Sequence, residues 1–279
     1  MFEQPLLQVK NVVKKFGDGC PKCASLEREA LIKNYCPECR TVYACRNISF
    51  ELYSGEILGI VGESGSGKST LMQCLYFDQE PTSGEMYIDV PQFAGKNVFE
   101  LSPKQKRAIR NNEFGMVYQN PIYGLRMHYS AISNIGEKLI AAGERHVAKM
   151  EDVGKRLLRE VEIPLFRSKE KPINFSGGMQ QRVQIAKALS NNPPVLFLDE
   201  ITTGLDLSVQ ANVLDLIKQI QRDYGVSMIV VSHDLAVIRM LSDRTLVMLD
   251  GEVIEQGLTD QILEDPQHGY TQQLVYSLI

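Results

Sequence analysis

The sequence predicts an α/β fold built around a parallel sheet, and three observations lead to it. An apolar strand at 57–61 runs through a glycine-rich loop into a helix from Ser69 to about Phe77. Strands alternate with helices again from residue 195 onward, and residues 102–190 carry mostly helical periodicity. Such alternation places helices on the faces of a parallel sheet, and the long helical stretch indicates a separate helical subdomain.

The composition is that of an ordinary globular protein. The chain has 279 residues, of which 44% are hydrophobic and 23% are charged, and its net charge is −4. This balance excludes a disordered or collagen-like chain and argues against a nucleic-acid partner. No apolar run approaches the roughly 18 residues of a membrane helix, and residues 1–10 lack the layout of a signal peptide. We therefore expect a cytoplasmic protein.

The N-terminal region is predicted to form a β-hairpin that a cysteine-rich insertion interrupts. Strand-like runs cover residues 6–16 and 48–52, and the insertion is placed at residues 17–46. Five of the six cysteines fall between residues 20 and 45. In a reducing compartment, paired Cys-x-x-Cys units hold a metal more often than they form disulfides.

Two Cys-x-x-Cys units give this insertion its chemistry: Cys20 with Cys23, and Cys36 with Cys39. Their spacing fits a tetrahedral four-thiolate Zn²⁺ site with Zn–S distances of about 2.3 Å. Such a site has no open position and would be structural. Rubredoxin-like iron and unliganded thiols are the alternatives. Charges of both signs are nearly balanced in the insertion, which argues against a nucleic-acid-binding finger.

The C-terminal third is predicted to restore the alternation of strands and helices. In order, we expect a strand at 195–198, a helix at 209–224, a strand at 228–231, a helix at 235–241, a strand at 245–249, a hairpin turn at 250–252 and a short helix at 259–264.

The glycine-rich loop carries a phosphate-binding motif. Residues 62–69 read G-x-x-x-x-G-K-S between a strand and a helix, as this motif requires. Its backbone amides converge on phosphate oxygens, the Lys68 ammonium reaches the β and γ phosphates, and the Ser69 hydroxyl coordinates Mg²⁺. The apolar strand at 195–198 ends in Asp199 and Glu200, which we assign to Mg²⁺ binding and to polarisation of the attacking water.

A Ser-Gly-Gly turn at 176–178, within Phe175-Ser-Gly-Gly-Met-Gln-Gln-Arg182, opens a predicted helix. With this motif the sequence resembles the ATP-binding-cassette family, whose signature it is. Three further family elements follow their expected order: Gln119 after the strand at 114–117, Asp206 in Gly-Leu-Asp, and the switch histidine His233.

The resemblance implies one cassette over residues 1–279, a P-loop NTPase domain with a RecA-like parallel-sheet core, an antiparallel β subdomain, a helical signature subdomain at 102–190 and a zinc-ribbon-like insertion at 17–46. ATP then lies between the phosphate loop of one cassette and the signature of a second, so the chain works as a dimer. The implied catalytic residues are Glu200, His233 and Gln119. The implied nucleotide-binding residues are Phe16, Gly62, Glu63, Ser64, Gly65, Ser66, Gly67, Lys68, Ser69, Thr70, Ser176, Gly177, Gly178 and Asp206. The implied Mg²⁺ ligands are Ser69, Gln119 and Asp199.

Two positions depart from the family or leave a choice open. Phe16 stands where the family stacks an aromatic ring on adenine, and Tyr43 is the alternative because the insertion begins directly after Phe16. Ile201 replaces the proline that usually follows the catalytic Glu. We expect a locally altered backbone there and retained activity.

Several segments look most like the cassette subunit of the carbon-phosphorus lyase complex, which breaks down phosphonates. They are residues 117–121, 124–126, 133–139, 161–164, 175–182, 204–211 and 268–271. The resemblance implies a homodimeric ATPase that docks on a soluble lyase core, whose iron-sulfur, S-adenosylmethionine-dependent partner cleaves the carbon-phosphorus bond. The alternative is the ATPase of a dipeptide, oligopeptide or nickel importer with a membrane permease. Gly124-Leu125-Arg126, in place of the importers' Ser-Leu-Asn-Pro, favours the lyase type. The cysteine insertion is not part of the lyase-cassette pattern, and we expect a metal-stabilised knob beside the adenine pocket that docks a partner or rigidifies the hairpin.

Overall fold

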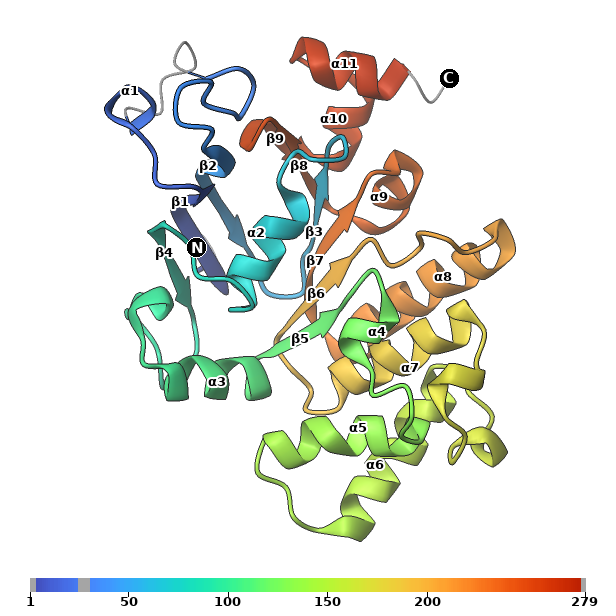
Figure 1. Ribbon diagram of the computed structural model, residues 1–279. Helices are drawn as coiled ribbons and strands as arrows, with labels where there is room; N and C mark the ends of the chain where they lie inside the picture. The colour runs from blue at the N-terminus through green and yellow to red at the C-terminus, as the bar shows by residue number, and fades with distance from the viewer. Residues whose placement is uncertain (1–3, 25–30, 277–279) are drawn as a thin grey trace. The chain divides into compact units, whose positions relative to one another are not determined.

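A computed structural model describes residues 4–24 and 31–276 (Figure 1). The chain divides into two compact units, one made of residues 1–102 and 231–279 and the other of residues 103–230. Each unit contains its own buried apolar core. Among the described residues, no helix combines the length and the apolar character that crossing a membrane requires.

The first unit contains an antiparallel sheet in the order β2-β1-β4. Its strands are β1 (Leu7–Phe16), β2 (Val42–Leu52) and β4 (Ser83–Ile88). Leu7, Val9 and Val12 of β1 are buried, as are Ile48, Phe50 and Leu52 of β2. One face of each strand is therefore apolar, the pattern of a sheet that covers a core on one side.

Strand β2 begins at Val42, six residues before the predicted Ile48, so that part of the prediction is wrong. Lys15 pairs with Tyr43 and Phe16 with Val42, so the hairpin continues up to the insertion. Pairing with β1, which is distant in sequence, extends the strand through residues whose own pattern is irregular. The segment between the strands is thus residues 17–41, and it contains the short helix α1 (Pro21–Ala24).

The remaining strands of the first unit are β3 (Ile57–Val61), β8 (Arg244–Leu249) and β9 (Glu252–Leu258). β3 runs parallel to β8, and β8 runs antiparallel to β9 through the turn at Asp250 and Gly251. The helices are α2 (Lys68–Leu75), α9 (Leu235–Leu241), α10 (Thr259–Glu264) and α11 (Gly269–Tyr276), with a 3₁₀ turn at Val98–Glu100. The sequence predicted neither β4 nor α11.

The second unit combines β-strands with a layer of helices. It contains β5 (Phe114–Val117) and β6 (Val195–Asp199), which pair in parallel, and residues 227–230 of β7 (Ser227–Ser232). Its helices are α3 (Pro103–Asn112), α4 (Pro121–Gly124), α5 (Ala131–Ala141), α6 (Val147–Glu160), α7 (Gly177–Leu189) and α8 (Leu207–Tyr224), with 3₁₀ turns at Leu165–Arg167 and Pro172–Asn174. Phe114 and Phe197 meet edge to face across the paired strands, with ring centroids 5.1 Å apart.

Candidate functional site

The phosphate loop folds around the ammonium group of Lys68. The loop leaves β3 after Val61, and α2 begins at Lys68 itself. The Lys68 Nζ donates hydrogen bonds to the carbonyl oxygens of Gly62 and Glu63 at 2.8 Å each, and it lies 3.4 Å from Ser66 Oγ. Because Lys68 is only 4% exposed, the loop holds a single positive charge at its centre.

Strand β2 supports the phosphate loop from behind. Gly67 has φ +101°, and a Cβ at this position would lie 1.9 Å from the Ala44 carbonyl oxygen. Only glycine fits there without moving the backbone of β2. The support continues through the β8–β9 turn, where the Gly251 amide donates to the Ser66 carbonyl at 3.1 Å and the Arg46 amide donates to the Gly251 carbonyl at 2.7 Å.

Tyr270 of α11 also holds the phosphate loop, a contact that the sequence analysis missed. The Glu63 amide donates to the Tyr270 hydroxyl oxygen at 2.8 Å. Burial raises the pKa of Tyr270, so the hydroxyl stays protonated at neutral pH. The two residues are far apart in sequence, and no local pattern predicts that they meet.

In the second unit, the structure brings the predicted Gln119 and Glu200 together. The parallel pairing of Val117 with Leu198 places the carboxyl ends of β5 and β6 at the same edge. Gln119 Nε2 donates to Glu200 Oε2 at 3.0 Å, and Thr203 Oγ1 donates to the same oxygen at 3.2 Å. Two donors thus orient one carboxylate.

The backbone at Glu200 adopts a conformation that is rare for a residue with a side chain. Its φ is +45°, in the left-handed region. Such a conformation costs about 1 to 3 kcal/mol and is concentrated at functional sites. Ile201, which follows, is 3% exposed and packs into the unit's interior. The neighbouring Asp199 is 6% exposed.

The predicted signature turn caps α7. Ser176 Oγ accepts a hydrogen bond from the Met179 amide at 3.4 Å. A Cβ at Gly178 would lie 2.5 Å from Cγ1 of Val209 on α8, so this glycine permits the close approach of the two helices. Asp206 in turn caps α8, because its Oδ1 accepts from the Val209 amide and from the Ser208 hydroxyl at 2.9 Å each. These hydrogen bonds lower the pKa of Asp206.

Helix α7 also holds both ends of the segment at 118–124, which follows β5. The sequence analysis did not predict these contacts. The Tyr118 amide donates to Gln184 Oε1 at 2.6 Å, and Gln184 Nε2 donates to the Tyr118 carbonyl at 3.0 Å. One turn later, Lys187 Nζ donates to the Gly124 carbonyl at 2.9 Å. The available sequence signal was a pair of polar residues, i and i+3, in the otherwise apolar C-terminal half of the helix, residues 183–189.

His233, the predicted switch histidine, follows β7 on an ordered turn in the first unit. The Asp234 amide donates to Ser232 Oγ at 3.0 Å, and Asp234 Oδ1 accepts from the Ala236 amide at 2.8 Å. Asp234 is therefore the N-cap of α9. His233, the residue before the cap, is exposed.

The two candidates for the aromatic residue that stacks on adenine, Phe16 and Tyr43, differ in solvent exposure. Phe16 is 46% exposed, and the Lys14 ammonium lies 5.1 Å from its ring centroid. Tyr43 is 3% exposed, and its hydroxyl donates to the Cys23 carbonyl at 3.0 Å. The low exposure of Tyr43 favours Phe16 as the residue that stacks on adenine.

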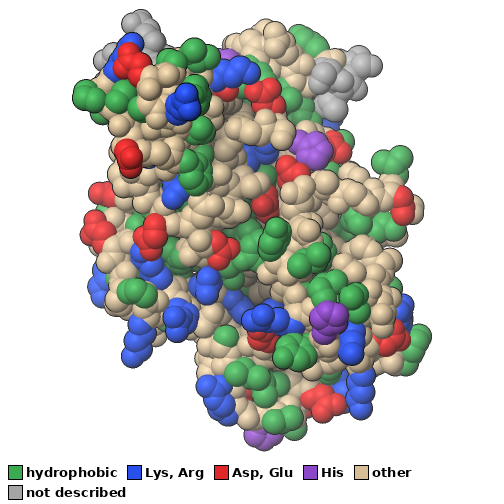
Figure 2. Space-filling model, in the orientation of Figure 1, with side chains coloured by type: hydrophobic (Ala, Val, Ile, Leu, Met, Phe, Trp, Pro, Cys, Tyr) green, Lys and Arg blue, Asp and Glu red, His purple; other side chains and the backbone are tan. Residues whose placement is uncertain are grey.

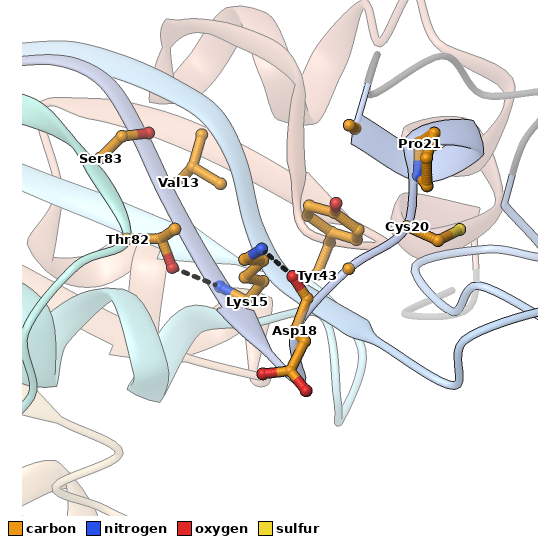
Figure 3. A pocket seen from close by; sticks show the side chains of 10 residues that line it. Val13, Lys15, Asp18, Cys20, Pro21, Tyr43, Thr82 and Ser83 are labelled. Carbon is orange, nitrogen blue, oxygen red and sulfur yellow. Dashed lines mark hydrogen bonds between the residues drawn. The ribbon is translucent and has the colours of Figure 1, made fainter.

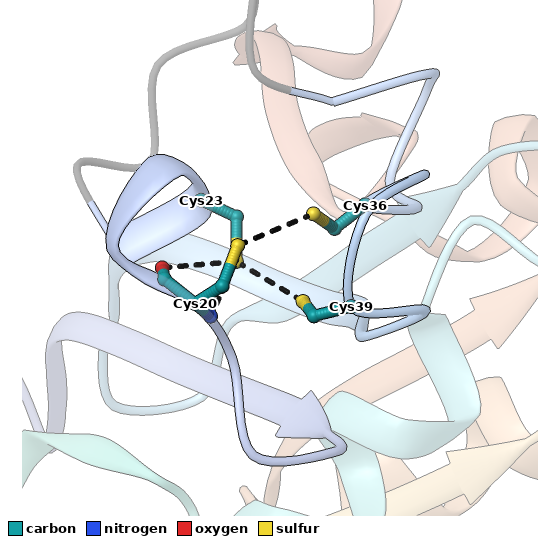
Figure 4. Close-up of side chains that lie close together, drawn as sticks. All are labelled: Cys20, Cys23, Cys36 and Cys39. Carbon is teal, nitrogen blue, oxygen red and sulfur yellow. Dashed lines mark hydrogen bonds between the residues drawn. The ribbon is translucent and has the colours of Figure 1, made fainter.

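The four cysteines of the insertion converge, as the close-up in Figure 4 shows. Cys20 and Cys23 come from the start of α1, and Cys36 and Cys39 come from a facing turn. All four sulfur atoms lie within 4.8 Å of one another, and three of the separations are 3.6, 3.7 and 3.8 Å. A tetrahedron with Zn–S bonds of about 2.3 Å has edges of about 3.8 Å, so the donor set has the size of a zinc site.

The other two cysteines lie outside this cluster. Cys45 and Cys74 are buried, and burial raises the pKa of both thiols, that of Cys74 to about 11. None of the six cysteines, all of which the structure describes, forms a disulfide. Buried neutral thiols of this kind behave as small apolar side chains.

Comparison with known proteins gives concordant matches. The family described as "ABC transporter" matches residues 45–203. The putative phosphonates utilization ATP-binding protein PhnK of Escherichia coli K12 is 46% identical over 233 residues, covering 84% of this chain and 90% of the relative. The dipeptide transport ATP-binding protein DppD of Bacillus subtilis 168 is 39% identical, covering 85% of this chain and 72% of the relative.

Solved structures agree with these sequence matches. The ATP-binding cassette MJ0796, in a dimeric post-hydrolysis state bound to ADP and Pi, superposes with a TM-score of 0.75 at 30% identity, covering 91% of this chain and 98% of that one. The protein cbiO1 from Clostridium perfringens, part of the transporter complex cbiONQ, gives 0.76 at 25% identity and covers 94% and 92% of the two chains.

Proposed function

Because the chain belongs to the ATP-binding-cassette family and is an ATPase of that family, we propose that it powers a complex that breaks down phosphonates. In this proposal two copies form a dimer that docks on a soluble carbon-phosphorus lyase core in the cytoplasm, and ATP turnover remodels that core. The observation that carries the proposal is the 46% identity with PhnK, which extends over 90% of that protein.

The phosphates of ATP bind to the loop at residues 62–69 in this proposal. The buried Lys68 ammonium and the convergent loop amides offset the charge of the β and γ phosphates. The Ser69 hydroxyl, the Asp199 carboxylate and the Gln119 amide oxygen supply the hard oxygen ligands that Mg²⁺ prefers. When bound, Mg²⁺ neutralises charge that develops on the phosphates.

Glu200 is the general base in this proposal. The hydrogen bonds from Gln119 and Thr203 engage one carboxylate oxygen, Oε2, and fix the orientation of the group. The Glu200 carboxylate accepts a proton from the attacking water, and His233 contacts the γ phosphate or the water network. The left-handed backbone of Glu200 supports a functional assignment because such strain is rarely retained without one.

The second half of the site comes from another copy of the chain. Ser176, Gly177 and Gly178 begin α7, whose first amides and positive dipole end suit a phosphate. Asp206, at the start of α8, contributes beside them. The dimeric state named for the cassette MJ0796 supports this arrangement.

Exposed apolar side chains in the second unit supply a docking surface for the partner protein. On α4, Ile122 is 63% exposed and Tyr123 is 77% exposed, and Tyr129 shortly after α4 is 64% exposed. Ile173, at 51%, belongs to the same region because its amide donates to the Met127 carbonyl at 3.3 Å. Large apolar side chains exposed together mark interaction surfaces. On the face drawn in Figure 2, hydrophobic side chains are exposed among interspersed acidic and basic ones.

The second candidate function is the ATPase of a peptide importer, and the match with DppD favours it. A structural detail at Gly124 weighs against it. A Cβ at this position would lie 2.1 Å from Oε1 of Gln184, the side chain that holds Tyr118. The serine that peptide importers commonly have here would therefore require a different arrangement of the segment.

Co-purification without detergent distinguishes the two candidates. A tagged chain is recovered from native cytosol, and its partners are identified by mass spectrometry. We expect lyase-core subunits, and we expect the double substitution Ile122→Glu and Tyr123→Glu to abolish their recovery. Val147→Glu is the matched control, because Val147 is equally exposed, at 71%, on a different helix. Recovery of a membrane permease from a parallel detergent extract of the membranes, with no lyase-core subunit recovered from the cytosol, would refute the lyase proposal.

We also propose that the four cysteines bind one structural Zn²⁺. The sulfur separations support this assignment, since they match the edges of a zinc-thiolate tetrahedron. The matching donor set is all sulfur, which suits zinc or iron and excludes the hard cations. Metal analysis of the purified chain should give one zinc per chain and none in the Cys36→Ser, Cys39→Ser variant. Wild-type protein without bound metal would refute the proposal.

A further inference from the structure

The cysteine cluster and the phosphate loop are connected to the same short stretch of β2. We propose that metal bound to the four cysteines sets the affinity of the phosphate loop for ATP, so that the insertion makes nucleotide binding metal-dependent. This inference rests on the zinc site and the ATP site proposed above.

The insertion has little regular structure of its own to hold it in place. Its described part contains one four-residue helix, α1, and two isolated bridges, Ile32 to Tyr35 and Tyr35 to Val42. Its buried contacts centre on the cysteines, with Val13, Leu31 and Tyr43 packed around them. A segment of this size gains much of its folding free energy from a bound metal when such a site is present. Metal binding therefore determines whether the insertion is ordered.

The cysteine cluster is attached to the ends of both hairpin strands. Thr41, the residue before β2, is fully buried, and its hydroxyl oxygen lies 2.9 Å from the Gly19 amide, which donates to it, and 3.2 Å from Cys39 Sγ. The Cys36 amide donates to the Thr41 carbonyl at 2.8 Å. Tyr43, the second residue of β2, reaches the Cys23 carbonyl with its hydroxyl. The positions of Thr41 and Tyr43 thus depend on the geometry of the four sulfurs.

Of the next three residues of β2, Ala44 and Cys45 contact the phosphate loop at Gly67, and Arg46 reaches it through Gly251. Ala44 presents its carbonyl against Gly67, where no side chain would fit. Arg46 donates its amide to Gly251, which in turn donates to Ser66. One run of β2, from Tyr43 to Arg46, therefore contacts the cysteine cluster at one end and the phosphate loop at the other. A shift at Tyr43 displaces the backbone on which Ser66 and Gly67 rest.

The metal site is open to exchange with solvent. Cys20 is half-buried and lines a hollow of about 440 Å³, shown in Figure 3, whose walls also include Lys15, Asp18, Tyr43 and Thr82. Lys15 Nζ donates to the Asp18 carbonyl at 2.5 Å on the wall of this hollow. A chelator or a change in free zinc can therefore act on the site while the rest of the unit stays folded.

The inference is tested with a fluorescent reporter in the intact chain. The protein contains no tryptophan, so Tyr35→Trp introduces a single tryptophan at an exposed position of the insertion, outside the residues assigned to nucleotide binding. Zinc content and the Kd for a non-hydrolysable ATP analogue are measured in three states: as purified, after chelation with Mg²⁺ restored, and after zinc is added back. We expect chelation to weaken binding about ten-fold or more, with zinc and not Mg²⁺ restoring it. We also expect zinc alone to shift the tryptophan emission.

Two variants separate coupling from unfolding. Tyr43→Phe keeps all four cysteines and loses the hydrogen bond to Cys23, so it should retain zinc while the effect of chelation on the Kd becomes smaller. Tyr87→Phe, which loses a hydroxyl contact with Glu85 on β4, is the matched control and should behave as wild type. Circular dichroism of the chelated chain reports whether the core stays folded.

The zinc site, the coupling and the ATP site would each be refuted by a different experimental result. A chain that carries no zinc and takes up none refutes the zinc site. A chain that carries zinc and binds the nucleotide equally well with and without it refutes the coupling alone. A zinc-loaded chain that does not bind nucleotide refutes the ATP site. Equal effects of chelation on the Kd in Tyr43→Phe and in wild type would show that β2 does not transmit the effect.

Discussion

Replacement of Gln184 should release the segment that carries Gln119. Gln184 is 1% exposed and makes two hydrogen bonds with the backbone of Tyr118, at 2.6 and 3.0 Å. A typical hydrogen bond contributes about 1 kcal/mol net, and an unsatisfied buried partner costs about 1 to 3 kcal/mol. We therefore expect Gln184→Ala to lower the free energy of unfolding by about 2 to 4 kcal/mol.

The same substitution should affect catalysis more than nucleotide binding. Tyr118 precedes Gln119, whose side chain orients the Glu200 carboxylate. Loss of the Tyr118 contacts should lower kcat and leave the Kd for ATP within about two-fold, since the phosphate loop is untouched. Urea unfolding gives the stability change, and steady-state ATPase assays together with equilibrium binding give the two constants.

Gln184→Met is the informative control. Methionine has nearly the volume of glutamine and forms neither hydrogen bond, so it separates polar contacts from packing. If the hydrogen bonds of Gln184 stabilise the chain and position Gln119, the Met and Ala variants should show similar decreases in the free energy of unfolding and in kcat. A Gln184→Met variant with wild-type stability, within about 0.5 kcal/mol, and with wild-type kcat would refute the reasoning.

Three further predictions follow from single contacts. Burial lowers the pKa of Lys138 to about 7 from 10.5, so between these pH values the unfolded chain binds more protons than the folded one. As pH rises from 7 to 10.5, the free energy of urea unfolding of wild type should therefore increase relative to that of Lys138→Met. A difference that stays constant with pH would contradict this. Gly67→Ala should lose nucleotide binding in calorimetry, because the new Cβ would lie 1.9 Å from the Ala44 carbonyl oxygen. Its circular dichroism spectrum should match that of wild type. Nucleotide binding with the wild-type Kd would contradict this prediction. Tyr270→Phe removes the hydrogen bond from the Glu63 amide, which contributes about 1 kcal/mol. Calorimetry should therefore show about five-fold weaker ATP binding. An unchanged affinity would contradict the role of Tyr270 in holding the phosphate loop.

The elements that the sequence predicted well are those with strong local signals. The apolar strand at Ile57–Val61 and the helices at Leu235–Leu241 and Thr259–Glu264 have the predicted bounds. Strand β2 was predicted too short because its first residues are ordered by pairing with β1 across the insertion. The pattern of these residues alone does not distinguish a strand from a loop.

The candidate site likewise contains some contacts that the sequence predicts and others that it does not. The contact between Gln119 and Glu200 follows from two motifs at the ends of adjacent parallel strands, and the cysteine cluster follows from its spacing. Gln184 and Tyr270 could not be predicted as contacts. Each reaches a backbone group that is distant in sequence, and a polar side chain in a helix carries no information about such a partner.

Hydrolysis by the Glu200→Gln variant tests the central claim most directly. Glutamine keeps the size of the side chain and can still bond to Gln119, but it cannot accept a proton from water at neutral pH. With Mg²⁺ present, we predict ATP binding close to wild type and a kcat lower by about a hundred-fold or more. A variant that turns over ATP at the wild-type rate would contradict the assignment of Glu200 and with it the proposed chemistry of the site.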